Sequence, residues 1–204
     1  MSDMAWEVLG SEEILNDEWI RMRADRCRMP GGTIVHPYYV LDFSDWVNVV
    51  ALTGADDVVL VRQYRHGIGR TIVELPCGRI DKGESAEQAI RRELMEETGY
   101  RAGDLRLLFS TYLSPGYSTE IIHVFCATGL DPGPAALEED EQIEVIALPL
   151  EAAVAMVGNG LVKNAAAICG ILALWRELGS PGGLAGEGDD GGRRSDGRID
   201  RGCD

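Results

Sequence analysis

Residues 78–100 read GRIDKGESAEQAIRRELMEETGY, and this stretch decides much of the fold and of the chemistry. Ser85 with Gln88 forms the pattern of a capping box, apolar residues then recur at helical spacing, and Gly99 supplies the left-handed residue at which a helix ends. The pattern predicts a helix over residues 86–98, which is entered through a polar, glycine-containing loop.

Three glutamates crowd the last turns of this helix. Glu93 and Glu97 are four residues apart and share one face, with Glu96 beside them. Like charges at this spacing destabilise a bare helix, and the helix dipole disfavours anions at its C-terminal end. Charge runs are usually solvated acidic faces. The alternative, which the preceding loop favours, is that divalent cations occupy the space between the carboxylates.

Runs of β-branched and apolar residues lie on both sides of this segment and predict the strands of a sheet. They cover residues 46–53, 58–65, 71–76, 104–114, 120–128 and 142–149. Two further segments have helical spacing, at residues 150–160 and 161–178. The order of elements predicts an α/β domain over residues 46–179.

The two ends of the chain differ from this domain. Residues 5–43 alternate apolar and polar positions in three short pieces separated by turn residues, which predicts a small antiparallel β-subdomain within residues 1–45. Residues 180–204 are rich in Gly, Asp and Arg, and we expect a disordered tail because they cannot bury enough apolar surface to fold.

Composition narrows the class of partner. The net charge is −15 and no block of basic residues offsets it, so a nucleic-acid backbone would be repelled. The five cysteines lack paired spacing, the N-terminus lacks the pattern of a signal peptide, and no apolar run is long enough for a membrane span. We therefore expect a cytoplasmic protein that binds neither nucleic acid nor membrane.

The central segment resembles the Nudix box, a glycine, glutamate and arginine pattern at fixed spacing. Every fixed place is filled in register, by Gly78, Glu84, Arg92, Glu93, Leu94, Glu96, Glu97 and Gly99. Tyr100 is the one departure, since it is aromatic where an aliphatic residue is usual. The resemblance implies an α/β/α sandwich with a mixed sheet, and an enzyme that hydrolyses a phosphoanhydride bond.

The resemblance also implies a cofactor, Mg²⁺ or Mn²⁺, bound by oxygen ligands. The implied ligands are the main-chain carbonyl of Cys77 and the carboxylates of Glu93, Glu97, Glu96 and Glu141. The resemblance further implies that Glu84 orients these metal ligands and that Arg92 pairs with a glutamate of the box to hold its rotamer.

The segment LEEDEQI at 137–143 is expected to complete the catalytic group. By matching to the resembled branch, Glu141 takes a ligand position and Glu139 that of the general base, beside Arg92 and Glu96. A solvated acidic loop is the alternative, and Glu120 is the reserve candidate for the base.

The flanks of the box resemble one branch, the ADP-ribose and nucleoside diphosphate sugar pyrophosphatases. The matching runs are VRQYR at 61–65, ELPCGRID at 74–81 and SPGYSTE at 114–120. Pro115 lies sixteen residues beyond Gly99, a spacing associated with ADP-ribose hydrolases, although a Pro-Gly turn also explains it. The substrate contacts implied by the resemblance are Trp19, Tyr39, Arg65, Glu74 and Pro115.

Within these contacts, alternatives remain. Arg62 and Arg65 lie on opposite faces of their strand, so we expect one of them, Arg65, to point into the site. Aromatic residues of the N-terminal sheet stack a nucleobase between two subunits in relatives, which implies a homodimer with a swapped β-subdomain. Core packing is the other explanation for Trp19 and Tyr39.

The function expected from the sequence is hydrolysis of ADP-ribose or a related nucleoside diphosphate sugar to a nucleoside monophosphate and a sugar phosphate. The third N-terminal strand, YYVLDF, lacks the arginine of some ADP-ribose hydrolases, so an ADP-sugar or GDP-sugar competes. Two alternatives are a house-cleaning hydrolase of oxidised nucleotides or dinucleotides, and a non-catalytic nucleotide-sugar sensor. Sensors can lose metal-binding glutamates, and this chain retains them.

Overall fold

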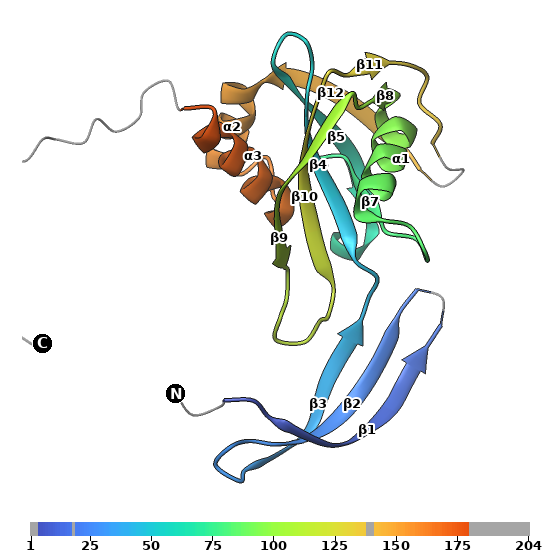
Figure 1. Ribbon diagram of the computed structural model, residues 1–204, viewed down its shortest axis with the longest axis vertical. Coiled ribbons are helices and arrows are strands. Elements are labelled where there is room, and N and C mark those ends of the chain that lie inside the picture. The colour runs from blue at the N-terminus through green and yellow to red at the C-terminus, as the bar shows by residue number, and fades with distance from the viewer. Residues whose placement is uncertain (1–3, 18, 138–140, 180–204) are drawn as a thin grey trace, which may run out of the picture.

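The computed structural model of the chain describes residues 4–17, 19–137 and 141–179. It contains a helix-flanked seven-stranded sheet and, below it, a separate three-stranded antiparallel sheet (Figure 1). This arrangement confirms the expected mixed α/β class with an additional N-terminal β-sheet. The expected disordered tail, residues 180–204, lies outside the described ranges.

The strands of the small sheet run in the order β1-β2-β3, with bounds β1 (Glu7–Asn16), β2 (Arg21–Arg28) and β3 (Ile34–Asp42). The large sheet has the order β12-β5-β4-β10-β9, while β6 pairs with β5 and β7 with β4. Its strands are β4 (Trp46–Leu52), β5 (Asp57–Arg65), β6 (Arg70–Glu74), β7 (Cys77–Arg79), β9 (Asp104–Tyr112), β10 (Ile121–Thr128) and β12 (Ile143–Pro149). The sheet is mixed because β10 runs parallel to β4 and antiparallel to β9. A two-stranded ribbon joins β8 (Tyr100–Arg101) to β11 (Asp131–Pro132).

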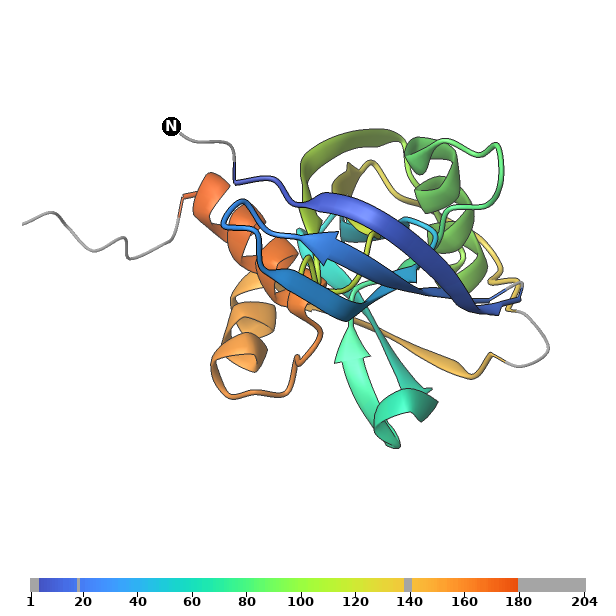
Figure 2. The same cartoon turned by 90° about the horizontal axis from the view of Figure 1, so that it is seen from below.

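Helices cover both faces of the large sheet (Figures 1 and 2). Helix α1 (Ala86–Thr98) packs on one face, where Val49 of β4 meets Leu94. Helices α2 (Leu150–Gly158) and α3 (Ala165–Glu177) pack on the other, where Val50 meets Ile171. Successive residues of β4 thus serve opposite layers, as strand alternation requires. A short 3-10 turn, η1 (His66–Ile68), links β5 to β6.

Two elements differ from the sequence expectation. The loop expected at residues 78–84 begins inside β7, because Cys77 and Gly78 pair with Asn48 and Val47 of β4. The last helix begins at Ala165 rather than at residue 161, because the Asn164 side chain accepts a hydrogen bond from the amide of Ala167 and caps it. The first difference brings the main chain of Cys77 to Glu97, and the second places the side chain of Asn164 beside Glu74.

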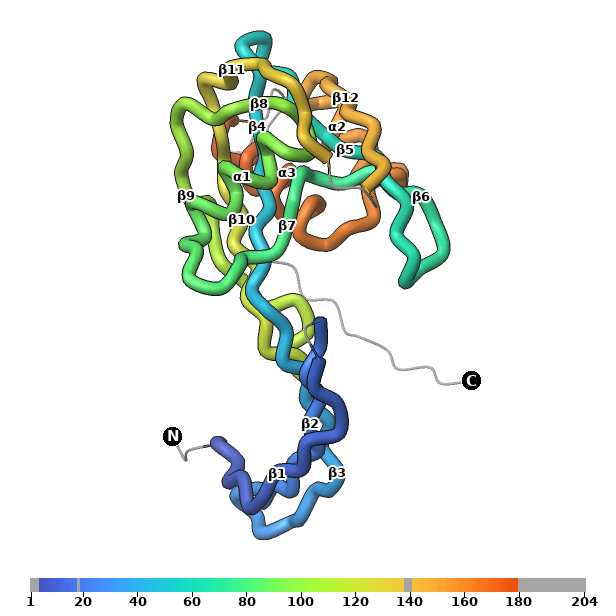
Figure 3. The backbone as a smooth tube through the Cα atoms, turned by 90° about the vertical axis from the view of Figure 1, so that its right-hand side faces the viewer, coloured from blue at the N-terminus to red at the C-terminus, as the bar shows by residue number. Residues whose placement is uncertain are grey.

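The small sheet is joined to the sandwich at the end of β3 (Figure 3). The Leu41 amide donates to the Tyr117 carbonyl at 2.7 Å, and the Thr119 amide donates to the Leu41 carbonyl at 3.1 Å. These bonds tie the loop between β9 and β10 to β3. All ten residues of β1 are exposed, including the apolar side chains of Val8 and Leu15. Among the described helices, none combines the length and apolar character that crossing a membrane requires.

Candidate functional site

Helix α1 places its glutamates through local sequence signals. The Ser85 hydroxyl accepts from the Gln88 amide while the Gln88 side chain accepts from the Ser85 amide, which completes the capping box. Gly99 ends the helix at φ 77°, a conformation that favours glycine. Ala89, Ile90 and Leu94 fill the buried face, so the helix orientation is fixed by packing.

Arg92 connects the box glutamates to one another. Its guanidinium donates to Glu84 at 2.9 and 3.1 Å, to Glu93 at 2.7 Å and to Glu96 at 3.2 Å. It also donates to the main-chain carbonyl of Arg79 at 3.0 Å. The hydrogen bond with Glu84 contributes most to raising the pKa of Arg92 and also lowers the pKa of Glu84. Arg92 therefore fixes the positions of three carboxylates and the β7 main chain.

Glu97 and Glu93 are carboxylates in an unfavourable environment. Burial raises the pKa of Glu97 to about 8, and neighbouring charges on Glu93 and Glu141 add to the rise. Burial likewise raises the pKa of Glu93 to about 7, against the opposing effect of Arg92. Glu97 is 3% exposed, and its Oε2 accepts from the Cys77 amide at 3.0 Å. The buried Glu97 and the partly buried Glu93 are thus more difficult to ionise than exposed carboxylates.

Gly78 makes this crowding possible. A Cβ atom at this position would lie 1.8 Å from the carboxyl carbon of Glu93, so only glycine leaves room for that side chain. The absence of a side chain at Gly78 lets β7 approach α1 closely.

The donor set fits a divalent cation. Carboxylate oxygens are the ligands that Mg²⁺ and Ca²⁺ prefer, and a bound cation would relieve the unfavourable charge on Glu93 and Glu97. Within the described ranges, no three acidic, histidine or cysteine side chains already converge on one point, since Glu93 and Glu96 are bonded to Arg92. Arg92 therefore holds the carboxylates of Glu93 and Glu96.

These side chains border a cavity of about 470 Å³, referred to below as the acidic cavity. The residues that line it are Trp19, Phe43, Ser44, Trp46, Gln63, Arg65, Cys77, Gly78, Arg79, Asp81, Arg92, Glu93, Glu96, Glu97 and Glu141. The structure thus brings Glu141 to the box glutamates although it lies far along the chain. Glu139, the expected base, lies outside the described residues.

Arg65 stands at the edge of the acidic cavity with two fixed contacts. Its Nε donates to Glu74 at 2.5 Å and its Nη2 to the Cys77 sulfur at 3.3 Å. Glu74 is 1% exposed, and its second oxygen accepts from Asn164 at 2.9 Å. Glu74 was expected to touch substrate, and these contacts place it behind Arg65. Arg62, by contrast, pairs with Glu144 on the surface.

The remaining expected contacts are spread around the small sheet. Trp19 lines the acidic cavity, and the guanidinium of Arg79 lies over its ring at 5.3 Å. Tyr39 is half exposed on β3. It lines neither the acidic cavity nor the second cavity described in the next paragraph. Pro115 lies in the loop between β9 and β10, whose Gly116 carbonyl accepts from the Tyr38 hydroxyl. The structure brings Trp19 to the glutamates, but not Tyr39 or Pro115.

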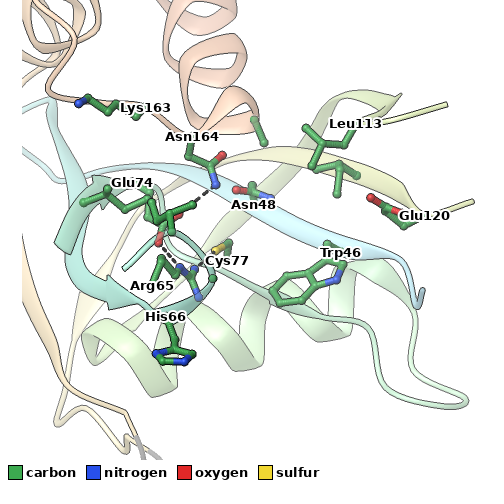
Figure 4. A pocket seen from close by; sticks show the side chains of 15 residues that line it. Trp46, Asn48, Arg65, His66, Glu74, Cys77, Leu113, Glu120, Lys163 and Asn164 are labelled. Atoms are coloured by element: carbon green, nitrogen blue, oxygen red, sulfur yellow. Dashed lines mark hydrogen bonds and ion pairs between the residues drawn. The ribbon is translucent and has the colours of Figure 1, made fainter. Parts of the chain in front are cut away.

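A second cavity, of about 500 Å³, adjoins the acidic cavity and is referred to below as the inner cavity (Figure 4). Arg65, Trp46 and Cys77 line both cavities. The other residues around the inner cavity are Asn48, His66, Gly67, Ile68, Ile72, Glu74, Leu113, Glu120, Ile122, Lys163, Asn164 and Ala166. Sequence reasoning missed Asn48, although a polar residue in the apolar run WVNVVALT was a usable signal.

Comparison with known proteins agrees with this geometry. The NUDIX domain model matches residues 44–168, and the model of a nucleoside diphosphate sugar hydrolase N-terminal domain matches residues 6–41. The chain is 34% identical to an ADP-ribose pyrophosphatase of Bacillus subtilis, covering 81% of this chain and 90% of the relative. It is 35% identical to a GDP-mannose pyrophosphatase of Citrobacter koseri, covering 77% and 88%.

The fold also matches a solved structure. The crystal structure of an ADP compounds hydrolase superposes with a TM-score of 0.77 at 22% identity, covering 87% of this chain and 96% of that one. At this identity the likeness concerns the fold. It agrees with the two-sheet arrangement described above.

Proposed function

The chain belongs to the NUDIX family, and on that premise we propose that it hydrolyses the diphosphate of ADP-ribose or a related nucleoside diphosphate sugar with Mg²⁺ as cofactor. The products are a nucleoside monophosphate and a sugar phosphate. The observation that carries the proposal is the pair formed by the buried Glu97 and the partly buried Glu93, which line one cavity with the fixed guanidinium of Arg65. The names of the relatives support the substrate class.

The reaction adds water to one phosphorus atom and breaks the bridging P–O bond. The proposed base for the water proton is Glu139, by resemblance, with Glu141 beside the metal ligands. A bound divalent cation screens the diphosphate charge and stabilises the leaving oxygen. The residues proposed to hold it are Glu93, Glu97, Glu96, Glu141 and the carbonyl of Cys77.

The other charged residues of the site position these groups. Glu84 and Arg92 keep the carboxylates of Glu93 and Glu96 in place, as their hydrogen bonds indicate. Arg65 is the proposed contact to the diphosphate, and Glu74 fixes its guanidinium from behind. A guanidinium whose orientation is fixed in advance loses little entropy when it binds phosphate oxygens.

The nucleobase is proposed to stack at the small sheet. Trp19 is supported by its position on the acidic cavity and Tyr39 by its exposure, while Pro115 would act from the neighbouring loop. The exposed apolar side chains of β1 support a homodimer in which the small sheet packs on a partner. The free thiols of the described cysteines support a reducing, cytoplasmic location.

A substrate panel tests the proposal. The full chain is incubated with Mg²⁺ and ADP-ribose, ADP-glucose or GDP-mannose, and in parallel with an oxidised nucleoside triphosphate or a diadenosine polyphosphate. Chromatography of the products should show a nucleoside monophosphate and a sugar phosphate from at least one nucleotide sugar. Preference for the last two substrates would favour a house-cleaning role. No turnover of any diphosphate would overturn the enzymatic proposal.

A further inference from the structure

The inner cavity contains two buried polar atoms for which the described part of the chain provides no hydrogen-bond partner. They are Oδ1 of Asn48 and Oε2 of Glu120. Asn48 is 4% exposed and Glu120 is 8% exposed, so neither side chain is extensively solvated at the surface. An unpaired buried polar group costs about 1–3 kcal/mol, and such atoms in a folded protein indicate a partner that binds there.

Both side chains face the same space. Asn48 precedes Val50 by two residues on β4, and Glu120 precedes Ile122 by two residues at the start of β10. Val50 and Ile122 pack toward α3, so strand alternation directs Asn48 to that face of the sheet. Glu120 immediately precedes β10 and lines the same cavity. Figure 4 shows Asn48 and Glu120 at the cavity with Trp46 near them.

The chemistry of the cavity selects its ligand. Both unpaired atoms are acceptors, so the ligand must bring hydrogen-bond donors to this part of the cavity. The Glu74 carboxylate is already paired with Arg65 and Asn164 and needs no donor from a ligand. The rest of the lining is mainly apolar, with Leu113 and Ile72 among its members. An uncharged sugar meets both conditions, since it carries hydroxyl donors around an apolar ring. The Asn48 amide pairs with a hydroxyl in either orientation.

The acidic cavity also has a buried polar atom without a partner among the described residues. Its unpaired buried atom is Nε2 of Gln63, which is a donor and suits phosphate oxygens. Arg65 lies between the two cavities and lines both. Each of the two cavities lined by the guanidinium proposed to bind the diphosphate therefore has an unpaired polar side chain.

We propose that the inner cavity is a subsite for the sugar half of the substrate, with Asn48 and Glu120 accepting hydrogen bonds from sugar hydroxyls. The proposal rests on the proposed function, because a diphosphate at Arg65 has one substituent on each side. Trp19, the proposed stacking residue, lies on the acidic cavity, so the substituent that enters the inner cavity is the sugar. Glu120 then acts as a hydroxyl acceptor rather than as the reserve base.

Calorimetric binding of product halves to the full chain with Mg²⁺ tests the subsite. Ribose 5-phosphate, glucose 1-phosphate and mannose 1-phosphate are titrated separately, and the tightest is carried forward beside AMP. The Asn48→Leu and Glu120→Met variants should each raise the Kd for the sugar phosphate by about threefold to tenfold, as expected for one lost hydrogen bond. The Kd for AMP should stay unchanged.

Two further readings exclude a merely structural effect. Because Asn48→Leu removes an unpaired polar atom, the Tm of the ligand-free protein should be unchanged or raised. Ser118→Ala is the matched control, since the Ser118 hydroxyl is also buried and unpaired but does not line the inner cavity. This variant should bind the sugar phosphate as the wild type does.

The outcomes separate the two proposals. If no sugar phosphate binds the wild type, or if both cavity variants bind it unchanged, the subsite is overturned. If the variants instead weaken the binding of AMP, the inner cavity is a site for the nucleobase and the assignment to the sugar is wrong. If sugar phosphate binding depends on Asn48 but no nucleotide sugar is hydrolysed, the subsite stands while the proposed function fails.

Discussion

The main-chain amide of Cys77 donates a hydrogen bond to Oε2 of the buried Glu97 at 3.0 Å. This bond joins β7 to the last turn of α1, and it is the strongest opposing influence on the burial that raises the pKa of Glu97. It also sets the separation between the helix and the strand that carries Gly78. The charged site therefore depends on one close approach of main chain to a buried carboxylate.

The approach at Gly78 can be tested by adding one methyl group. In Gly78→Ala the new Cβ would overlap the Glu93 carboxyl group, which is the end of a flexible side chain and can move, so the unfolding free energy should fall by only about 1 kcal/mol, the low end of the cost of overpacking. Hydrolysis should fall sharply because Glu93 is displaced. Urea unfolding and the substrate assay measure the two effects. Gly54→Ala is the control, since its Cβ meets nothing within 4 Å. Wild-type activity in Gly78→Ala would contradict the role given to Glu93.

Arg65 and Arg62 differ in what their removal leaves behind. Arg65→Leu leaves the buried Glu74 with Asn164 as its remaining partner, and should lower the unfolding free energy by about 2–3 kcal/mol. The Arg65 side chain is 35% exposed, so the loss is smaller than for a fully buried pair. Arg62→Leu breaks a surface pair and should cost less than about 1 kcal/mol. Equal losses of unfolding free energy in the two variants would show that the Arg65–Glu74 pair stabilises the fold no more than the surface pair does.

Stability without metal should depend on pH. The folded-state pKa values of Glu97 (about 8) and Glu93 (about 7) lie above the ordinary value of 4.5, so the unfolded chain releases these protons first. The contribution to stability is complete below about pH 4.5 and is lost as pH rises toward 8. Urea midpoints measured with a chelator from pH 5 to 8.5 should fall, and less steeply in Glu97→Gln. Identical slopes in the two proteins would contradict the shift assigned to Glu97.

The exposed apolar side chains of β1 predict that the chain self-associates. Sedimentation equilibrium of the full chain should show a dimer, and Val8→Asp should shift it toward monomer by placing a charge in the apolar surface. Leu178→Asp, at a similarly exposed apolar position at the C-terminal end of α3, serves as the control and should leave the dimer intact. A monomeric wild type at micromolar concentration would contradict the proposed swapped arrangement.

The helix with its glutamates could be predicted from sequence because its signals are local. The capping pattern from Ser85 to Gln88, the helical spacing and Gly99 lie within one short stretch, and each has a direct steric or hydrogen-bonding cause. The position of Glu97 on the same face as Glu93 follows from helix geometry alone.

Contacts between segments that are distant in the sequence cannot be predicted from local patterns. Glu74 is tied to Arg65 across the β5–β6 pair and to Asn164 at the start of α3, and no local pattern specifies such a partner. The sequence around Asn48 predicts an apolar strand, because alternation indicates which side chains are buried. It does not predict which groups a buried amide contacts. The sequence predicts too early a start for α3, because the alanine-rich run has helical spacing and gives no sign that Asn164 caps the helix.

The most direct test of the central claim is the kinetic comparison of Glu97→Gln with the wild type on a nucleotide sugar at saturating Mg²⁺. If Glu97 holds the catalytic cation, kcat should fall by at least about a hundredfold, while KM changes little, because the loss is confined to the transition state. Folding of the variant is verified by its urea midpoint. A kcat equal to that of the wild type would contradict the assignment of this buried carboxylate to the reaction.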